Sequence, residues 1–427
     1  MASTCALAGP MPSADGTASR RAALQMLDAV LRNGRTLEAA AQRVRGLSAP
    51  DQGLAVAIAG EVLRRLPDLD ALIDGATRQR LPDDSKARMV LRMALAQKIG
   101  LQTPDHAIVA TALPLVDGGP RRLVHGVLGT LLRRWVDPSE APRLPAAVEE
   151  RWLDAWGNDV VEAARRQIAQ RPPLDLTFAS AEAARRYAAE NGGVSLAPNH
   201  VRLGESGAVP ALTGFSEGGW WVQDLAASLP ARLIPGAAAD VLDLCSAPGG
   251  KAMQLSAAGH RVVAVDASDS RLQRLAQNLE RTGLSAELIR ADMLKWKPTQ
   301  EFDAILLDAP CSATGTFRRH PEVLYRARPA VIRESAEVQA RLLPRAAEWV
   351  KPGGTLVYSV CSLEPEEGEA IIADFLAGHP GFQLEPGDLP DFVTSTANGH
   401  VRILPGVLAD QGGLDGFFAA RLVRGSA

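Results

Sequence analysis

Two cysteines of this chain follow apolar runs that have the composition of buried strands. Cys311 comes after the run 302–310, which ends in Asp308-Ala309-Pro310, and Cys361 follows the run 353–360. A thiolate beside a cation or a helix N-terminus is a strong nucleophile at neutral pH, although the reference pKa of cysteine is about 8.5. One cysteine in such a core is more often an inert apolar side chain. Two at neighbouring strand ends indicate nucleophilic chemistry.

A glycine-rich turn joins another apolar run to a helical pattern. The segment Val241–Lys251 reads VLDLCSAPGGK. Gly249 and Gly250 allow the backbone to approach a ligand closely, and the N-terminus of the following helix favours negative charge. The turn matches neither the dinucleotide fingerprint nor a phosphate loop. It therefore favours a nucleoside ligand without a polyphosphate, such as S-adenosyl-L-methionine, over NAD or ATP.

Acidic residues end the next two predicted strands. Asp266 lies 23 positions after Asp243, a spacing that suits hydrogen bonds from ribose hydroxyls to a carboxylate. Asp292 follows the third strand and is expected near the adenine or the ribose. Taken singly, each acid is as readily explained as a strand-end turn or a helix cap. Together, at the carboxyl ends of neighbouring strands, they favour a cofactor site.

A basic loop follows Cys311. Arg318, Arg319 and His320 lie within Thr314–Glu322 and are predicted to contact a nucleic-acid backbone; the alternative is a solvated loop. Cys245 lies inside the glycine-rich turn and is interpreted as a packing residue, and Cys5 has no evident role.

The second half of the chain alternates strands and helices, which predicts a doubly wound parallel sheet of the Rossmann-like class. The strands are expected at 240–245, 261–267, 286–292, 302–310 and 353–360, with helices at 251–259, 269–283 and 329–350. A last strand within Asp415–Val423 is expected at the sheet edge.

The first part of the chain reads as helix throughout. Apolar residues of the first helix recur at helical spacing, with Ser19 as the predicted N-cap and Gly34 as the stop. Residues 51–66 and 70–79 are expected to form separate helices. A proline-rich break at Pro138–Pro145 then precedes a small α+β module. The predicted division is a disordered tail (1–18), an all-helical domain (19–138), a linker with the small module (139–215) and a catalytic domain (216–427).

Composition limits the class of protein. With 427 residues, the chain is too long for a single core. Its four cysteines are widely spaced and have no metal-ligand spacing, which favours a reducing cytoplasm and no metal. Residues 1–140 carry 18 basic and 14 acidic side chains, whereas the net charge of the whole chain is −3. A polyanionic partner would therefore have to be bound by local patches. No apolar run approaches the length of a membrane helix.

The motifs CSAPGGK, DAPCSATGTFRRHP, VYSVCSLEPEE and DGFFAARL, in this order, resemble RNA cytosine-5 methyltransferases that use S-adenosyl-L-methionine. The first part resembles the NusB-like helical domain, an RNA-binding domain, of RsmB/Sun-type enzymes, which modify 16S ribosomal RNA. The segments DQGLAVAIAGEVLRRLPDLDALI and VLRMALAQKIGL carry this second resemblance.

The resemblance implies that Cys361 is the nucleophile, that Asp308 stabilises the base, and that Cys311 assists proton removal or enzyme release. In DNA cytosine-5 methyltransferases the Pro-Cys cysteine is itself the nucleophile, so these roles rest on the resemblance. The cofactor-binding residues that it implies are Cys245, Ser246, Ala247, Pro248, Gly249, Gly250, Lys251, Asp266, Arg271, Asp292 and Asp308.

The expected function is methyl transfer to carbon 5 of a cytosine in small-subunit ribosomal RNA, by a cytoplasmic monomer with no membrane partner. Two alternatives stay open: an enzyme that acts on transfer RNA or another ribosomal RNA, and a non-catalytic RNA-binding or assembly factor. The presence of Cys311, Cys361 and Asp308 argues against the second alternative.

Overall fold

The computed structural model describes residues 16–204, 207–236, 239–393, 396 and 399–426. They form two compact units. The first contains the chain up to Arg151 with Ile168–Gln170 and His320–Arg326, and the second contains Trp152–Gln167, Arg171–Arg319 and Ala327 onward. Most of the tail predicted for residues 1–18 lies outside the described residues, as does Cys5.

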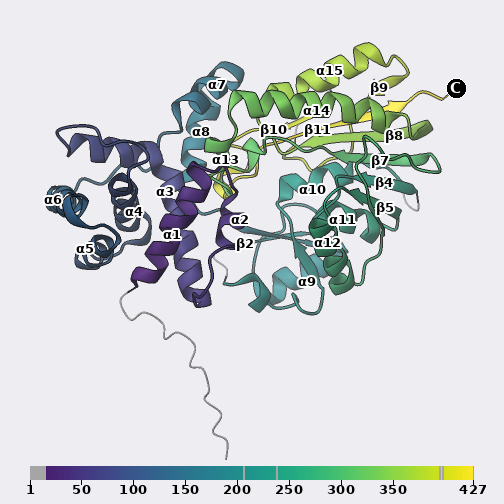
Figure 1. Ribbon diagram of the computed structural model, residues 1–427. Helices are drawn as coiled ribbons and strands as arrows, with labels where there is room; N and C mark the ends of the chain where they lie inside the picture. Colours follow the sequence, from purple (N-terminus) through teal and green to yellow (C-terminus); the bar gives the residue numbers. More distant parts are fainter. Residues whose placement is uncertain (1–15, 205–206, 237–238, 394–395, 397–398, 427) are drawn as a thin grey trace, which may run out of the picture. The chain divides into compact units, whose positions relative to one another are not determined.

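The first unit is helical, as the sequence predicted (Figure 1). Its core is built from the apolar faces of several helices and includes the fully buried Leu27, Val62 and Leu91. Its helices are α1 (Thr17–Leu31), α2 (Leu37–Ala41), α3 (Ala49–Gly75), α4 (Lys86–Leu101), α5 (Asp105–Ala112), α6 (Gly118–Arg133) and, from the later segment, α13 (Val323–Arg326).

Two helix boundaries in this unit differ from the prediction. The N-cap of α1 is Gly16 instead of Ser19, because the Ser19 hydroxyl donates to Asp51 Oδ1 at 2.8 Å instead of capping its own helix. The helices expected at 51–66 and 70–79 are joined in α3, which bends at Arg65 and continues through Pro67. A proline two residues after a bend can continue the helix, because the bend removes the clash with the preceding turn.

The second unit contains a small antiparallel sheet in the order β2-β1-β3. Its strands are β1 (Leu174–Phe178), β2 (His200–Leu203) and β3 (Trp220–Val222), with α9 (Ala181–Asn191) between the first two. The sheet therefore extends past residue 215, where the sequence placed the end of this module. Before it along the chain come α7 (Ala146–Trp156) and α8 (Asn158–Ala169).

The large sheet of the second unit has the order β10-β11-β8-β7-β4-β5-β6, with β9 paired to β11. The strands from β4 to β8 are parallel, as predicted, and β11 runs antiparallel to β8. The bounds are β4 (Asp240–Leu244), β5 (Arg261–Asp266), β6 (Glu287–Arg290), β7 (Phe302–Asp308), β8 (Val350–Val360), β9 (Phe382–Leu384), β10 (Val401–Ile403) and β11 (Phe417–Arg424).

The prediction that the last strand lies at the sheet edge is wrong. Strand β11 is flanked by β8 on one side and by β10 and β9 on the other. All four residues Phe417–Ala420 are buried, which suits a strand that is covered on both faces.

Helices cover both faces of the large sheet (Figure 1). On one face, α10 (Leu225–Arg232), α11 (Gly250–Ala257) and α12 (Asp269–Thr282) pack against Val241 and Leu306. On the other, α14 (Pro329–Ala347) and α15 (Glu369–Gly378) pack against Leu242 and Leu307. Successive strand residues point to opposite faces. The carboxyl ends of β4 and β7 form the topological switch point of this sheet, where ligands bind in open α/β sheets.

Candidate active site

The two cysteines predicted to act together lie side by side. Strands β7 and β8 are neighbours, with Asp308 opposite Ser359, so the loops that follow them leave the same edge of the sheet. Cys311 Sγ and Cys361 Sγ are 3.5 Å apart. The Gly315 N–H donates to the Cys361 carbonyl at 3.1 Å and holds the loops together. This separation places both sulfurs within reach of a single substrate ring.

Two of the cysteines, Cys311 and Cys245, have thiol pKa values above the usual value of cysteine. The hydrogen bond to Cys361 and burial raise the pKa of the Cys311 thiol well above its usual value, and the charge of Glu367 adds to the effect. Cys311 therefore keeps its proton at neutral pH. Its sulfur is within hydrogen-bond distance of the sulfur of Cys361, and either sulfur can be the donor. For Cys245, burial is the main cause that raises the thiol pKa to about 12, which agrees with its interpretation as a packing residue.

A cation joins the glycine-rich turn to the strand end that carries Asp308. Lys251 Nζ donates to Asp308 Oδ2 at 2.7 Å, and the Ser359 hydroxyl donates to Asp308 Oδ1 at 2.9 Å. Burial lowers the pKa of Lys251, but the charge of Asp308 and the hydrogen bond to it raise this pKa more, and the charge of Cys361 contributes. Lys251 is therefore positively charged beside Asp308, close to the cysteines, and its ammonium also lies 5.4 Å from the centre of the Phe417 ring.

The turn after β4 is held by the acid that ends β5. Ala247 N donates to Asp266 Oδ2 at 3.2 Å and Ser268 N to Oδ1 at 2.9 Å. Arg271 donates to the carbonyl of Ala247. Gly249 has φ +106, and a Cβ there would lie 2.0 Å from the side chain of Leu275. Only glycine fits this position, because it combines a positive φ with close packing against Leu275.

A buried carboxylate lies beneath this turn. Asp243 is fully buried, and neither of its oxygens has a hydrogen-bond partner among the described residues. Burial, with the nearby charge of Asp308, raises the pKa of Asp243 well above its usual value. A buried polar group without a partner is costly. It is consistent with a ligand that supplies hydrogen-bond donors, such as the amino and hydroxyl groups of S-adenosyl-L-methionine. Asp292, by contrast, is half exposed and accepts a hydrogen bond from Leu294 N.

The basic loop differs from the prediction. Arg318 is 1% exposed, and its guanidinium binds Asp224 and Asp415. Arg319 is partly exposed and also binds Asp415. Burial raises the pKa of Asp415, but the two arginines lower it more, so it stays ionised. Arg318 is therefore a buried ion-pair residue and is not placed to contact a phosphate. The third predicted residue, His320, belongs to the first unit.

A polar network that the sequence did not predict joins the two cysteine loops. Glu367 is fully buried and binds the residues that directly follow each cysteine, Ser312 and Ser362. The motif VYSVCSLEPEE contains this glutamate, but nothing in the local pattern distinguishes it from its neighbour Glu366, which is exposed. Only the packing of the segment Pro365–Glu367 separates the two.

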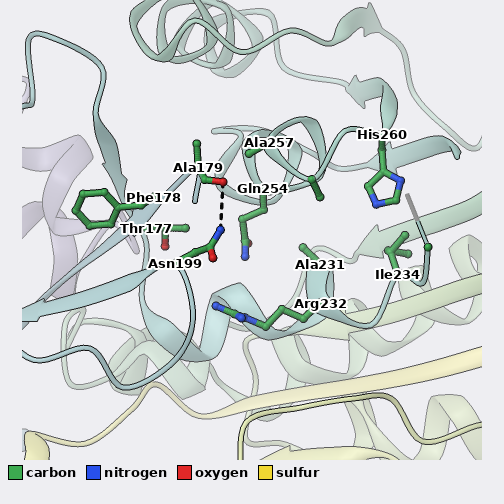
Figure 2. Close-up of a pocket in the computed structure, with 12 residues that line it drawn as sticks. Thr177, Phe178, Ala179, Asn199, Ala231, Arg232, Ile234, Gln254, Ala257 and His260 are labelled. Atoms are coloured by element: carbon green, nitrogen blue, oxygen red, sulfur yellow. Dashed lines mark hydrogen bonds between the residues drawn. The ribbon is translucent and has the colours of Figure 1, made fainter. Parts of the chain in front are cut away.

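Other cavities lie away from these residues. One of about 210 Å³ is lined by Thr177, Asn199, Arg232, Gln254 and His260, among others (Figure 2). His260 directly precedes β5, so this cavity is at the amino edge of the parallel strands, opposite to the cysteines. Another, of about 620 Å³, lies in the first unit between α6 and the loop after α3. None of the predicted catalytic or cofactor-binding residues lines either cavity.

The described residues contain neither a metal-binding group nor a membrane-spanning helix. No group of three or more histidine, cysteine, aspartate or glutamate side chains could hold a metal ion, and no helix is long and apolar enough to cross a membrane.

The fold is a Rossmann-like α/β domain, with a cysteine pair and a glycine-rich turn at the carboxyl edge of its sheet, that follows an all-helical domain along the chain. Comparison with known families gave two matches. The family described as "16S rRNA methyltransferase RsmB/F" matches residues 231–423, and the family described as "NusB family" matches residues 17–133.

Individual relatives match nearly the whole chain. Ribosomal RNA small subunit methyltransferase B from Klebsiella pneumoniae (strain 342) is 34% identical over 95% of this chain and 98% of its own length. The protein of the same name from Xanthomonas campestris pv. campestris is 34% identical over 97% of this chain and 99% of its own length. Among solved structures, the fold of the protein PH0851 covers 97% of this chain and 100% of its own, with a TM-score of 0.74 and 24% identity.

The chain belongs to the 16S ribosomal RNA methyltransferase RsmB/F family. The expected family and fold class are therefore confirmed. S-adenosyl-L-methionine, the methyl donor of this class of enzyme, is the cofactor.

Proposed function

We propose that this enzyme methylates carbon 5 of a cytosine in small-subunit ribosomal RNA through a covalent bond between Cys361 and carbon 6 of the base. The observation that carries the proposal is the 3.5 Å distance between Cys311 Sγ and Cys361 Sγ, with the Lys251–Asp308 pair alongside. The assignment of Cys361 as the nucleophile rests on the family resemblance.

The chemistry explains why a nucleophile is needed. Carbon 5 of cytosine is a poor nucleophile until a thiolate adds to carbon 6 and converts the ring to an enamine. S-adenosyl-L-methionine supplies the methyl group that the activated carbon 5 then takes. The carbon 5 proton next leaves to a base, its electron pair restores the ring double bond, and the bond between carbon 6 and Cys361 Sγ breaks.

Cys311 assists the last step. Its raised pKa keeps the thiol protonated, so its S–H can donate a hydrogen bond to the sulfur of Cys361. This bond stabilises Cys361 as the leaving thiolate and lowers the barrier to release of the RNA. If Cys311 were a thiolate, its negative charge would instead repel the departing thiolate of Cys361.

Asp308 and Lys251 act on the base. Asp308 is part-exposed at the end of β7, where its carboxylate can accept a hydrogen bond from the cytosine ring and stabilise the positive charge of the protonated adduct. Lys251 holds this carboxylate in place through the 2.7 Å bond. The target cytosine must leave its stack to reach these side chains.

The cofactor is bound along the turn Cys245–Lys251, with Arg271 bonded to its backbone. The carboxylate of Asp266 accepts hydrogen bonds from the ribose hydroxyls, and Asp292 lies near the adenine. Glycine at position 249 lets the ligand approach the backbone. The enzyme acts as a monomer in the cytoplasm, with its NusB-like unit contributing to RNA binding.

The test is methyl transfer from labelled S-adenosyl-L-methionine to small-subunit RNA, both free and in partly assembled subunits, followed by digestion to nucleosides. Label in 5-methylcytidine is the expected result. Label in another nucleoside would overturn the cytosine-5 assignment. Transfer to transfer RNA alone would overturn the substrate, and transfer to no RNA would favour a non-catalytic assembly factor.

A further inference from the structure

One buried carboxylate is bonded to both cysteine loops. Glu367 ends the short 3-10 helix Pro365–Glu367 and is fully buried. Its Oε1 accepts from Ser312 N at 2.8 Å, and its Oε2 accepts from the Ser362 hydroxyl at 2.5 Å and from the Ser312 hydroxyl. Ser312 follows Cys311, and Ser362 follows Cys361, so both bonded residues are next to a cysteine.

The surrounding groups make this arrangement rigid. Gln339 of α14 donates to Glu367 Oε1 at 3.1 Å and to the Pro310 carbonyl at 2.9 Å, so it supports the Cys311 loop on both sides of the cysteine. The two serine hydroxyls are 3.2 Å apart. The phenol of Tyr358 donates to the Glu367 carbonyl at 2.7 Å, which fixes the backbone of the glutamate.

The buried carboxylate of Glu367 is not explained by its contribution to stability alone. Burial raises the pKa of Glu367, while the bonds from the two serines and Gln339 oppose that shift. Buried ionised groups are weak contributors to stability, because desolvation offsets most of the gain from their bonds. A carboxylate is nevertheless well suited to joining two loops, because its two oxygens together accept four or more hydrogen bonds in a fixed plane.

We propose that Glu367 is a positioning residue that sets the separation of Cys311 Sγ and Cys361 Sγ and thereby the rate at which the enzyme is released from the covalent RNA intermediate. The inference rests on the proposed function, because release is a step of that reaction. Glu367 does not reach the substrate. It acts on the two sulfurs through its bonds to Ser312 and Ser362, and its charge also contributes to the raised pKa of Cys311.

The first experiment measures the separation of the sulfurs without RNA. Diamide oxidises two neighbouring thiols to a disulfide and takes up the two electrons and two protons that they lose. The rate of Cys311–Cys361 disulfide formation, followed by mass spectrometry of the full-length protein, is expected to fall at least about tenfold in Glu367→Gln, since misplacement by about 1 Å can cost about 100-fold in a rate that depends on geometry. Glu366→Gln, the same change at the exposed neighbour, is the matched control and is expected to react at the wild-type rate.

The second experiment measures release. With RNA and cofactor present, Glu367→Gln is expected to lower kcat by at least about tenfold. KM for RNA should fall with kcat, because release follows methyl transfer and does not affect kcat/KM, and Kd for the cofactor should not change. Covalent protein–RNA adduct is expected to accumulate on a denaturing gel. A residue with a purely structural role would lower the unfolding midpoint without this accumulation.

Two outcomes would overturn the inference. Wild-type disulfide formation and wild-type kcat in Glu367→Gln would show that the carboxylate does not position the cysteines. If Glu367→Gln does not fold, Ser362→Ala is the second variant, because it removes the hydroxyl that links the Cys361 loop to Glu367. Wild-type disulfide formation and wild-type kcat in Ser362→Ala would also overturn the inference. Failure of the proposed function itself is distinguishable, because it would appear as normal turnover of Cys361→Ala, while the disulfide measurement requires no turnover.

Discussion

The two ends of the loop that follows β7 differ in their surroundings and in their roles. At its start, Cys311 lies beside Cys361 with the sulfurs 3.5 Å apart. At its end, Arg318 is buried between Asp224 and Asp415. The sequence motif predicted function at both ends, from residue type and from nearness in the chain. The difference teaches that a reactive side chain is identified by its partner in space, and that the guanidinium of an arginine beside an active site can be occupied by buried partners within the protein.

The largest expected effect is at the cysteine end. Cys361→Ala should lower turnover by about 10⁴-fold or more, because removal of a nucleophile eliminates the covalent route. Cofactor affinity should be unchanged, since Cys361 lies outside the turn after β4. Single-turnover methyl transfer and cofactor titration measure the two quantities. Full loss in Cys311→Ala with normal turnover of Cys361→Ala would mean that the roles of the cysteines are exchanged.

At the arginine end we expect a loss of stability. Arg318→Ala removes the nearest cation of the buried Asp224 and one of the two cations of Asp415, and should lower the free energy of unfolding by about 3–5 kcal/mol, the typical cost of removing one partner from a buried ion pair. Denaturant unfolding measures it. The control is Arg261→Ala, which removes the exposed partner of Asp240 and should cost much less, because solvent screens an exposed ion pair. Similar values for both variants would contradict the contrast between the two ends.

Cys311→Ala should have a smaller effect on the chemistry than Cys361→Ala. Without the hydrogen bond to the leaving sulfur, turnover should fall by about 100-fold, within the range typical of a group that assists proton transfer or leaving-group departure. The covalent protein–RNA adduct should accumulate and be visible on a denaturing gel. Normal turnover without adduct would remove Cys311 from the mechanism.

The smallest expected effect is at Arg319. Its guanidinium is partly exposed and bonded to Asp415, so Arg319→Gln should cost about 1 kcal/mol of stability and leave the salt dependence of RNA binding unchanged. Binding measured at several salt concentrations tests this. If the slope of log affinity against log salt concentration falls by about one, Arg319 contacts a phosphate. The contrast between the two ends of the loop would then not hold.

Much of the architecture was predictable from local patterns. Alternating strands and helices indicated the doubly wound sheet, because parallel strands buried on both faces are continuous apolar runs such as Ala304–Leu307. The glycine requirement at position 249 was also visible, although its cause, contact with Leu275, was not. The position of β11 could not be read from its own residues, because an apolar strand has the same composition whether or not another strand covers its outer side.

The sequence by itself determined the chemistry that is available: two cysteines and an aspartate placed after strands, a glycine-rich turn, and acids at the ends of the next strands. Tertiary structure decided which of these groups interact. It brought Cys311 next to Cys361 and placed Lys251 beside Asp308. It buried Arg318 between two carboxylates. It also buried Glu367, and not Glu366, between the two cysteine loops. The physical reason is that hydrogen bonds and ion pairs act over a few ångströms, and such distances between residues far apart in the chain are set only when the strands pair and the helices pack.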